Sequence, residues 1–438
     1  MKRLLLLAIV AVPFLATAQN TAYFMERLPQ KLSFNPAFVP EVNFYLGLPG
    51  IGGITSNFYN SGFNYNELDY FMDNVSKPNY NPDDFVTSIG DFNRFNAEMQ
   101  VNIFSVGFRT KKDGYFSFNV TASNITNFRA ASDIAYLLAD ADEIQDEDFP
   151  IQIDDIDLLS NTYWTYSFTY SRKINEKLTV GVSPKLNFNQ FAIKTEDIGY
   201  RIELEENEFN KEYTQYPLGE VLLGMPTEIN PKAVDGNELD LDRGLFPDDW
   251  PDGITLSDLH RNASFSMDMG ATYSLNEWLF SASILNMGTS TWRKDAYRLY
   301  GNNEEIQISE EEKIRIGIPA KIYIGAVRQF SPRWNYGLML GNTFFHSGSM
   351  PSATVSLNGY VGSALSTSVS YTAGYKFDNL GLGLRLRVFP GLDLFMVTDN
   401  IIQAFNYKKA HRLSATFGIN LAVGVNDEFK LPVDETEL

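Results

Sequence analysis

The chain of 438 residues contains no cysteine. A disulfide framework of the kind that stabilises many exported proteins is therefore excluded. Histidine is also rare: the three copies, at positions 260, 346 and 411, have neither metal-ligand spacing nor a known hydrolase motif. The sequence accordingly predicts no catalytic residue, no metal site and no cofactor, and we do not expect an enzyme.

Basic residues are scarce relative to acidic ones. Lysine and arginine total 35 against 54 aspartates and glutamates, which gives a formal net charge of −19 at pH 7. Nucleic acids and anionic lipid surfaces both attract basic proteins. This charge balance argues against a nucleic acid as a partner.

Long apolar runs are missing after the N-terminus, where none reaches the roughly 18 residues of a membrane-spanning helix. At the N-terminus itself, Lys2 and Arg3 precede an apolar run of about a dozen residues, which is the length of a secretory signal. The small residues Ala16 and Ala18 then frame a cleavage site. Residues 1–18 are predicted to be a signal peptide that is cleaved after Ala18.

Aromatic residues are abundant, at 14% of the chain, and many polar and apolar residues alternate. In LTVGVSPKLNF (178–188) and LGLGLRLRV (380–388), every second residue is apolar and most of the others are polar. This is the period of a strand with one apolar face. Such runs last about 10 residues, as a tilted transmembrane strand requires, whereas soluble strands average about 5–6.

The connections between the predicted strands alternate in length. Tight turns are expected at 111–113, 173–176, 275–277, 331–333, 362–364 and 390, and long links at 59–96, 129–160, 195–261 and 290–316. Short turns at one end and long loops at the other are typical of outer-membrane barrels, whereas a soluble β-sandwich gives no such rhythm. Fourteen strands result, near 43–58, 97–109, 115–128, 161–172, 177–194, 262–274, 278–289, 317–330, 334–345, 352–361, 365–374, 379–389, 391–400 and 411–424.

The predicted fold is therefore an all-β, transmembrane, antiparallel β-barrel of about 14 strands that spans residues 43–424. In the second segment, 97–109, the apolar phase slips between Ile103 and Phe104, which predicts a β-bulge. Aromatic residues near the tight turns suggest an interfacial girdle: Tyr170, Tyr273, Trp278, Phe330, Trp334, Tyr360 and Phe389. A polar tail, 425–438, follows the last strand.

The long links 129–160 and 195–261 are rich in aspartate and glutamate. Carboxylate clusters suit calcium, but the segment DGNELDLD (235–242) lacks the glycine and glutamate positions of an EF-hand loop. A solvated acidic surface is the favoured interpretation, and calcium binding stays open. The link 195–261 is too long to lack structure of its own, so ordered elements are expected in it.

Residues 19–42 form an irregular leader before the first strand. Asn35 and Pro36 favour a turn, and Pro40 prevents regular pairing, while Phe38 gives the segment an apolar side chain to bury. A barrel of fourteen strands is too wide for wall side chains alone to fill. We therefore expect the leader to enter the lumen as a small plug, with these four residues as its core.

The alternation also identifies charged residues that face the lumen. They are Lys185, Asp268, Arg385, Arg387 and Asp393. Interior charges need partners, so these side chains are expected to pair with one another or with the leader, although they could instead line a solute pathway.

The signal peptide followed by LSFNPAFVP (32–40) and YLGLPGIGGI (45–54) resembles a family of outer-membrane proteins of unknown function from type IX-secreting, Bacteroidetes-type bacteria. The likeness extends through VTDNII (397–402) and LSATFGINLAV (413–423). The NPAF element is similar to a segment of the PorP/SprF-like barrels, and the general shape is similar to FadL-like barrels. The resemblance implies an outer-membrane location and no assigned activity.

Two functions follow as hypotheses. The first is a structural or partner-binding barrel that sits in outer-membrane lipid and binds proteins of secretion or surface complexes. The alternative is a FadL-like or porin-like channel for a small solute. The site-poor lumen favours the first, because neither an unobstructed path nor a gated one is visible in the sequence.

Overall fold

The computed structural model describes residues 19–74, 77, 92–111, 114–131, 151–207, 210–236, 238–240, 243–247, 257–302, 305–345, 348–362, 364–374, 379–389 and 391–425. The predicted signal peptide and nearly all of the C-terminal tail lie outside these ranges. Among the described residues, no helix is both long and apolar enough to cross a membrane.

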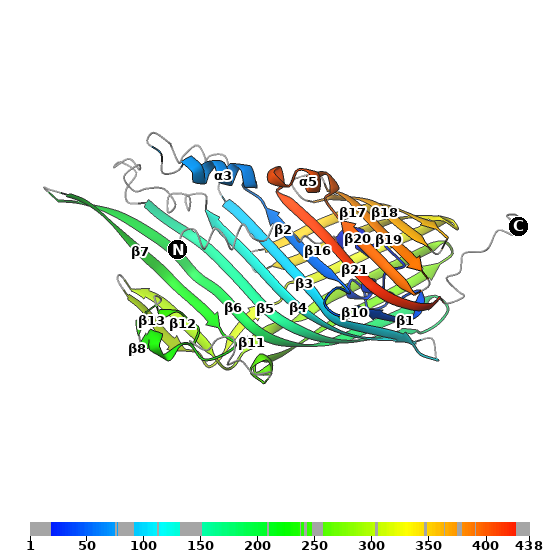
Figure 1. Cartoon of the computed structure of the whole chain (residues 1–438), viewed down its shortest axis with the longest axis horizontal. Helices are drawn as coiled ribbons and strands as arrows, with labels where there is room; N and C mark the ends of the chain where they lie inside the picture. Colours follow the sequence, from blue (N-terminus) through cyan, green and yellow to red (C-terminus); the bar gives the residue numbers. More distant parts are fainter. Residues whose placement is uncertain are drawn as a thin grey trace, which may run out of the picture.

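The described strands form a closed antiparallel barrel of fourteen strands, which confirms the predicted fold class (Figure 1). Both halves of the first strand pair with the last strand and with the second, and these pairings close the barrel. In chain order the wall is β1 (Val42–Gly47) with β2 (Ile54–Asn60), β3 (Phe92–Arg109), β4 (Gly114–Ala131), β5 (Ile151–Lys173), β6 (Leu178–Asn207), β10 (Ala263–Leu275), β11 (Trp278–Trp292), β14 (Ile314–Gly317) with β15 (Ala320–Ser331), β16 (Trp334–Phe345), β17 (Gly348–Val361), β18 (Leu365–Ala373), β19 (Leu380–Phe389), β20 (Leu392–Thr398) and β21 (Arg412–Val425).

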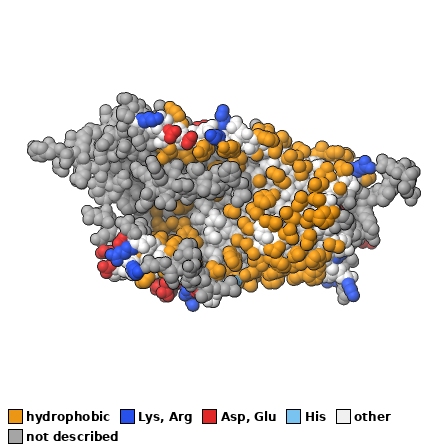
Figure 2. Space-filling model, in the orientation of Figure 1, with side chains coloured by type: hydrophobic (Ala, Val, Ile, Leu, Met, Phe, Trp, Pro, Cys, Tyr) orange, Lys and Arg blue, Asp and Glu red, His pale blue; other side chains and the backbone are white. Residues whose placement is uncertain are grey.

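Alternation along each strand separates the two faces of the wall. On β5, Thr165, Ser167 and Thr169 are buried inside the barrel, whereas Phe168 is 42% exposed on the outside. The outer side chains together form a broad apolar band, and charged side chains lie beyond it at either end (Figure 2). An apolar band of this kind matches the hydrocarbon layer of a bilayer.

Two irregularities interrupt the wall near its start. The β3–β4 register shifts between Asn102 and Phe104, which confirms the predicted bulge. The first strand is broken at Leu48–Gly53, where Gly50 adopts a φ of 75°. An ideal Cβ on Gly52 would lie 2.8 Å from the Gly47 backbone, so only glycine fits this tight fold.

The two acidic links are shorter than the sequence suggests, because wall strands continue into them. Strand β6 runs to Asn207 and turns into β7 (Asn210–Gly224), so that a two-stranded ribbon projects beyond the barrel (Figure 1). Strands β12 (Ala296–Asn302) and β13 (Glu305–Glu310) pair beside β7, and β8 (Val234–Asp235) and β9 (Glu238–Leu239) join them. This extension has its own buried cluster, which includes Leu223, Met225, Ile229, Tyr297 and Ile308.

Two helices lie at the same end as this extension. They are α3 (Tyr65–Asn74), which precedes β3, and α5 (Ile401–Phe405), which follows β20 (Figure 1). At the opposite end the described turns are tight: β10 and β11 are separated by two residues, as are β15 and β16. The predicted alternation of short turns and long links is therefore present in the fold.

The predicted aromatic girdle needs one correction. Tyr170, Tyr273, Phe330, Trp334 and Phe389 are exposed on the outer face near the tight turns. Tyr360 instead points into the lumen and is only 5% exposed, because β17 places it on the same face as Asn358, which is also buried. Its ring lies 4.7 Å from the Arg27 guanidinium carbon of the leader.

Candidate functional site

The leader, residues 19–42, lies inside the barrel and joins the wall at β1. It contains the short helix α2 (Gln19–Tyr23) and the 3-10 turn η1 (Pro29–Ser33), and most of its side chains from Asn20 to Pro40 are buried. Backbone hydrogen bonds of the i to i−3 type, such as Phe24 N–H to Thr21 O, make it a compact body. It connects to the wall at its C-terminal end, where β1 begins at Val42.

The N-terminal end of the leader is held by one carboxylate of the wall. Asp399, just after β20, accepts hydrogen bonds from the backbone N–H groups of Asn20 (3.1 Å) and Thr21 (2.8 Å). It also accepts the Thr21 hydroxyl at 2.6 Å, and that hydroxyl lies 2.7 Å from the Ser370 hydroxyl on β18. Hydrogen bonds to a charged group are the stronger kind, so Asp399 is the principal anchor of this end.

Aromatic packing holds the middle of the leader. Tyr23 and Phe38 meet edge to face with ring centroids 5.2 Å apart, and both pack with Phe24 on Tyr323 and Met339 of the wall. The Tyr23 hydroxyl lies 2.8 Å from the Ser281 hydroxyl of β11. Burial raises the pKa of Tyr23 to about 12, so the phenol stays neutral in this position.

Glycines of the wall provide the room for the leader. An ideal Cβ on Gly181 of β6 would lie 2.2 Å from the Pro36 carbonyl, and one on Gly270 of β10 would lie 1.9 Å from Asn35 Oδ1. An ideal Cβ on Gly381 of β19 would lie 2.0 Å from the Thr21 hydroxyl. A side chain at any of these three positions would collide with the seated leader, which explains why glycine occupies them.

The leader also carries charges into the lumen. Arg27 Nε lies 3.3 Å from Glu41 Oε2, and Glu26 accepts a hydrogen bond from Asn335 Nδ2 at 3.1 Å. Burial raises the pKa of the Glu26 carboxyl, while Lys31 and Arg27 nearby oppose that rise. Burial lowers the pKa of the Lys31 ammonium, and the carboxylates of Glu26 and Glu41 oppose that effect.

The four residues proposed as the leader core are all buried. Asn35 donates from Nδ2 to the carbonyls of Ala271 (3.3 Å) and Ala282 (3.1 Å). The Pro36 carbonyl accepts the Ser171 hydroxyl, and the Pro40 carbonyl accepts Arg109 Nη2 at 2.7 Å. Phe38 belongs to the aromatic cluster described above. Whether these residues block a solute path stays a prediction.

The charged residues expected in the lumen form two separate groups. Lys185 Nζ on β6 lies 2.6 Å from Asp268 Oδ2 on β10. Arg385 and Arg387 of β19 both bind Asp393 of β20, at 2.7 and 2.8 Å. Each group is thus paired within the wall.

Two lumenal acids escaped the sequence reasoning. Besides the anchor Asp399, Glu98 of β3 receives the Lys321 ammonium of β15 at 2.9 and 3.0 Å. Both acids have a signal in the sequence, since each interrupts a strand-like segment with a charge. Their partners lie more than 200 residues away, and no spacing rule connects such positions.

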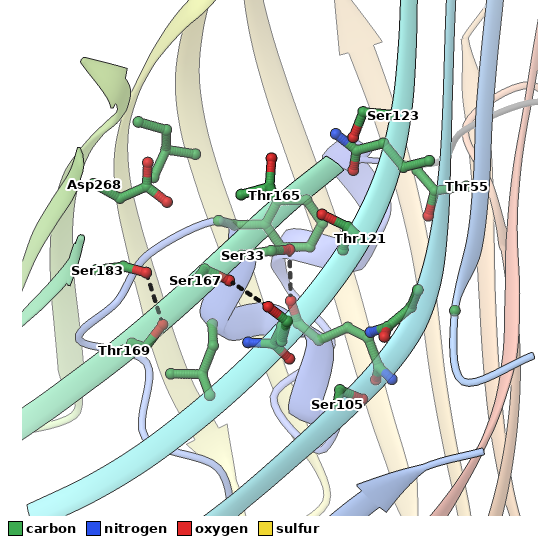
Figure 3. Close-up of a pocket in the computed structure, with 18 of the residues that line it drawn as sticks. Ser33, Thr55, Ser105, Thr121, Ser123, Thr165, Ser167, Thr169, Ser183 and Asp268 are labelled. Atoms are coloured by element: carbon green, nitrogen blue, oxygen red, sulfur yellow. Dashed lines mark hydrogen bonds between the residues drawn. The ribbon is translucent and has the colours of Figure 1, made fainter. Parts of the chain in front are cut away.

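A cavity of about 160 Å³ remains between the leader and the wall (Figure 3). One water needs about 10–15 Å³ on this scale, so the space suits a solute as large as several waters. Hydroxyl groups of β5, including Thr165, Ser167 and Thr169, project toward it, as Figure 3 shows. Leader residues Leu28, Leu32 and Phe34 form part of the other side.

A family model described as "Family of unknown function (DUF5723)" matches residues 36–315 and 302–399. The chain belongs to this family. No curated protein matches. Membership therefore assigns no activity to the lumen.

Several solved structures are similar to this chain at low sequence identity. The toluene transporter TbuX of Ralstonia pickettii has a TM-score of 0.45 and 8% identity over 94% of this chain and 99% of that chain. A FadL homologue of Pseudomonas aeruginosa has a TM-score of 0.44 and 10% identity over 94% and 100%. The toluene transporter TodX of P. putida has a TM-score of 0.40 and 10% identity over 94% and 97%.

Proposed function

We propose that this protein is an outer-membrane channel for a small solute and that its leader is the movable element that opens and closes the path. The observation that carries the proposal is the arrangement of the lumen. The leader is a separate body seated inside a wide barrel, it joins the wall at Val42, and it leaves a cavity between itself and β3–β6.

The contacts of the leader suit a segment that can leave its seat. Its N-terminal end is held by polar groups around Asp399, and groups released from such contacts can be solvated by water. It also carries Arg27, Lys31 and Glu41 into the lumen, where burial disfavours charge. A permanent plug of the same size would be more stable with apolar residues at these positions.

A disulfide crosslink that locks the leader in its seat (the lock experiment) tests this proposal directly. The hydroxyls of Thr21 and Ser370 are 2.7 Å apart, and the chain has no native cysteine, so the double variant Thr21→Cys/Ser370→Cys provides a single reversible crosslink. We expect oxidation to reduce solute entry into proteoliposomes to the background rate and reduction to restore it. The rate at which the proteoliposomes swell in glycerol, alanine or glucose measures solute entry.

The single variant Thr21→Cys is the matched control, because it loses the same hydroxyl without forming the crosslink. Its rate of solute entry should change with neither oxidant nor reductant. Solute entry through the oxidised double variant at the wild-type rate would contradict the movable leader. A wild-type protein that admits none of the three solutes would contradict the channel.

We further propose that the long-loop end faces the cell exterior and the tight turns face the periplasm. The chain without cysteine allows a clean test with a membrane-impermeant maleimide on intact cells. Glu238→Cys, on the exposed side of β9, should react within minutes, whereas Glu176→Cys, in the tight turn before β6, should react only after lysis. Labelling of Glu176→Cys first would reverse the orientation.

The partner-binding hypothesis, including a link to secretion or surface complexes, stays a prediction. Its test is a pulldown of the tagged full chain from native membranes. Recovery of the barrel without a stoichiometric partner would count against it.

A further inference from the structure

We propose that the cavity beside the leader is a binding site for a small, neutral, polyhydroxylated solute, with a pyranose sugar as the model. The inference rests on the proposed channel function for its physiological meaning, and it names the solute class. Three properties of the cavity support it: its hydroxyl-rich wall, its cancelled charge and its apolar opposite side.

The wall side of the cavity is a grid of hydroxyl and amide groups. Strands β4, β5 and β6 each present a row of these groups to the lumen, and the rows comprise Asn119, Thr121 and Ser123; Thr165, Ser167 and Thr169; and Ser183 and Asn187. Alternate residues of a strand are about 6.8 Å apart and neighbouring strands about 4.8 Å apart. Each hydroxyl can both donate and accept, so the grid can meet several sugar hydroxyls at once.

Hydrogen bonds within the grid hold its side chains in place. Thr165 bonds Asn187 at 2.8 Å, and the hydroxyls of Thr169 and Ser183 are also 2.8 Å apart. Thr121 of β4 and Ser167 of β5 line the same cavity and present further hydroxyls to it.

The hydroxyl grid discriminates between solute classes. An apolar solute would displace water from the hydroxyls that line the cavity without replacing the hydrogen bonds of that water. Leaving a buried donor or acceptor unsatisfied costs about 1–3 kcal/mol, whereas a hydroxylated solute can bond these groups. The lining therefore disfavours a hydrocarbon.

Charge excludes the other main class. The cationic lining residues are Lys185 and Lys321. Lys185 lies 2.6 Å from Asp268, and Lys321 lies 2.9 Å from Glu98. Each ammonium thus has a carboxylate as its direct partner, and an anionic or cationic solute finds no excess charge of opposite sign to bind.

The leader side of the cavity is mostly apolar. Leu28, Leu32 and Phe34 line it opposite the hydroxyl grid, together with Tyr45 of β1. A pyranose has hydroxyls around its perimeter and C–H groups on its faces, so it matches a site with one polar and one apolar side. Because the leader provides the apolar side, its departure would dismantle the site and release the solute.

Equilibrium dialysis of the detergent-solubilised full chain against radiolabelled glucose, maltose, gluconate, glucosamine and toluene tests the inference. We expect saturable binding of glucose or maltose, and at most weak binding of the other three. Ser167→Ala and the isosteric Thr121→Val should each weaken sugar binding about tenfold, which corresponds to the loss of one hydrogen bond of about 1.4 kcal/mol.

Ser356→Ala is the matched control, since Ser356 of β17 is also buried in the lumen but does not line the cavity. It should leave sugar affinity unchanged. Toluene or a charged solute binding more tightly than both sugars would overturn the inference, as would no sugar binding or an equal loss in Ser356→Ala. Dialysis needs no transport, so sugar binding with failure of the lock experiment would separate this inference from the channel proposal.

Discussion

Removal of residues 20–40 is expected to convert a barrel of low conductance into a large and stable pore. Fourteen strands enclose a lumen wider than wall side chains can fill, so single-channel conductance should rise at least about tenfold over that of the intact chain. The leader fills this lumen through contacts with strands from β3 to β21. Planar bilayer recordings of the purified deletion and wild-type chains measure the difference.

A second variant keeps this prediction testable if the deletion fails to assemble. Gly181→Val places a branched side chain where the Pro36 carbonyl sits, and that backbone cannot move aside without unseating the leader. Gly317→Val is its control, because a Cβ on Gly317 meets nothing within 4 Å. Conductance should increase for Gly181→Val alone.

Unchanged conductance in both the deletion and Gly181→Val, with folded barrels in each case, would show that the leader is not the obstruction. The wall itself or the long-loop end would then have to close the path.

Leu384→Arg is expected to destabilise the barrel severely. Leu384 of β19 is 42% exposed within the apolar band, and an arginine facing the bilayer midplane costs about 2–4 kcal/mol. The adjacent Arg385→Leu should cost less, although Arg385 is only 1% exposed. Asp393 would keep its hydrogen bonds from Arg387, at 2.8 and 3.1 Å.

Urea titration of folded barrels in lipid vesicles, read by the shift of the folded band on an unheated gel, compares the two variants. Leu384→Met serves as the control for a change of shape without charge, and such a substitution usually costs less than about 1.5 kcal/mol. Equal destabilisation by Leu384→Arg and Arg385→Leu would mean that the inward and outward faces of β19 are wrongly assigned.

Strand positions, strand number and the bulge near Ile103 were predictable because they depend on local order. Alternation such as Leu380 to Val388 reports which residues share a face, and short turns such as 275–277 report which strands are neighbours. Tyr360 is an exception. It lies near a turn like the girdle aromatics, but the phase of β17 turns its side chain inward to Arg27.

The charged lumenal residues were predictable as a set but not as pairs. Arg385, Arg387 and Asp393 are close in the sequence and meet across one tight turn. The Lys321 and Glu98 pair joins β15 to β3 across the lumen, and nothing local in either strand specifies the other. Nothing in the sequence marks Asp399 as a partner of the leader, and only the folded chain shows that it holds Asn20 and Thr21.

By itself, the amino-acid sequence determined that this protein is a barrel, because a period of two and the alternation of turn lengths are properties of neighbouring residues. It also indicated that Asn35 to Pro40 are irregular and that a wide lumen needs filling. Tertiary structure alone decided what fills it and how: Asn20 meets Asp399 and Pro36 meets Gly181, contacts between positions far apart in the chain. The cavity beside the leader has the same origin, since closure of the barrel brings its hydroxyl rows and the apolar leader face to face.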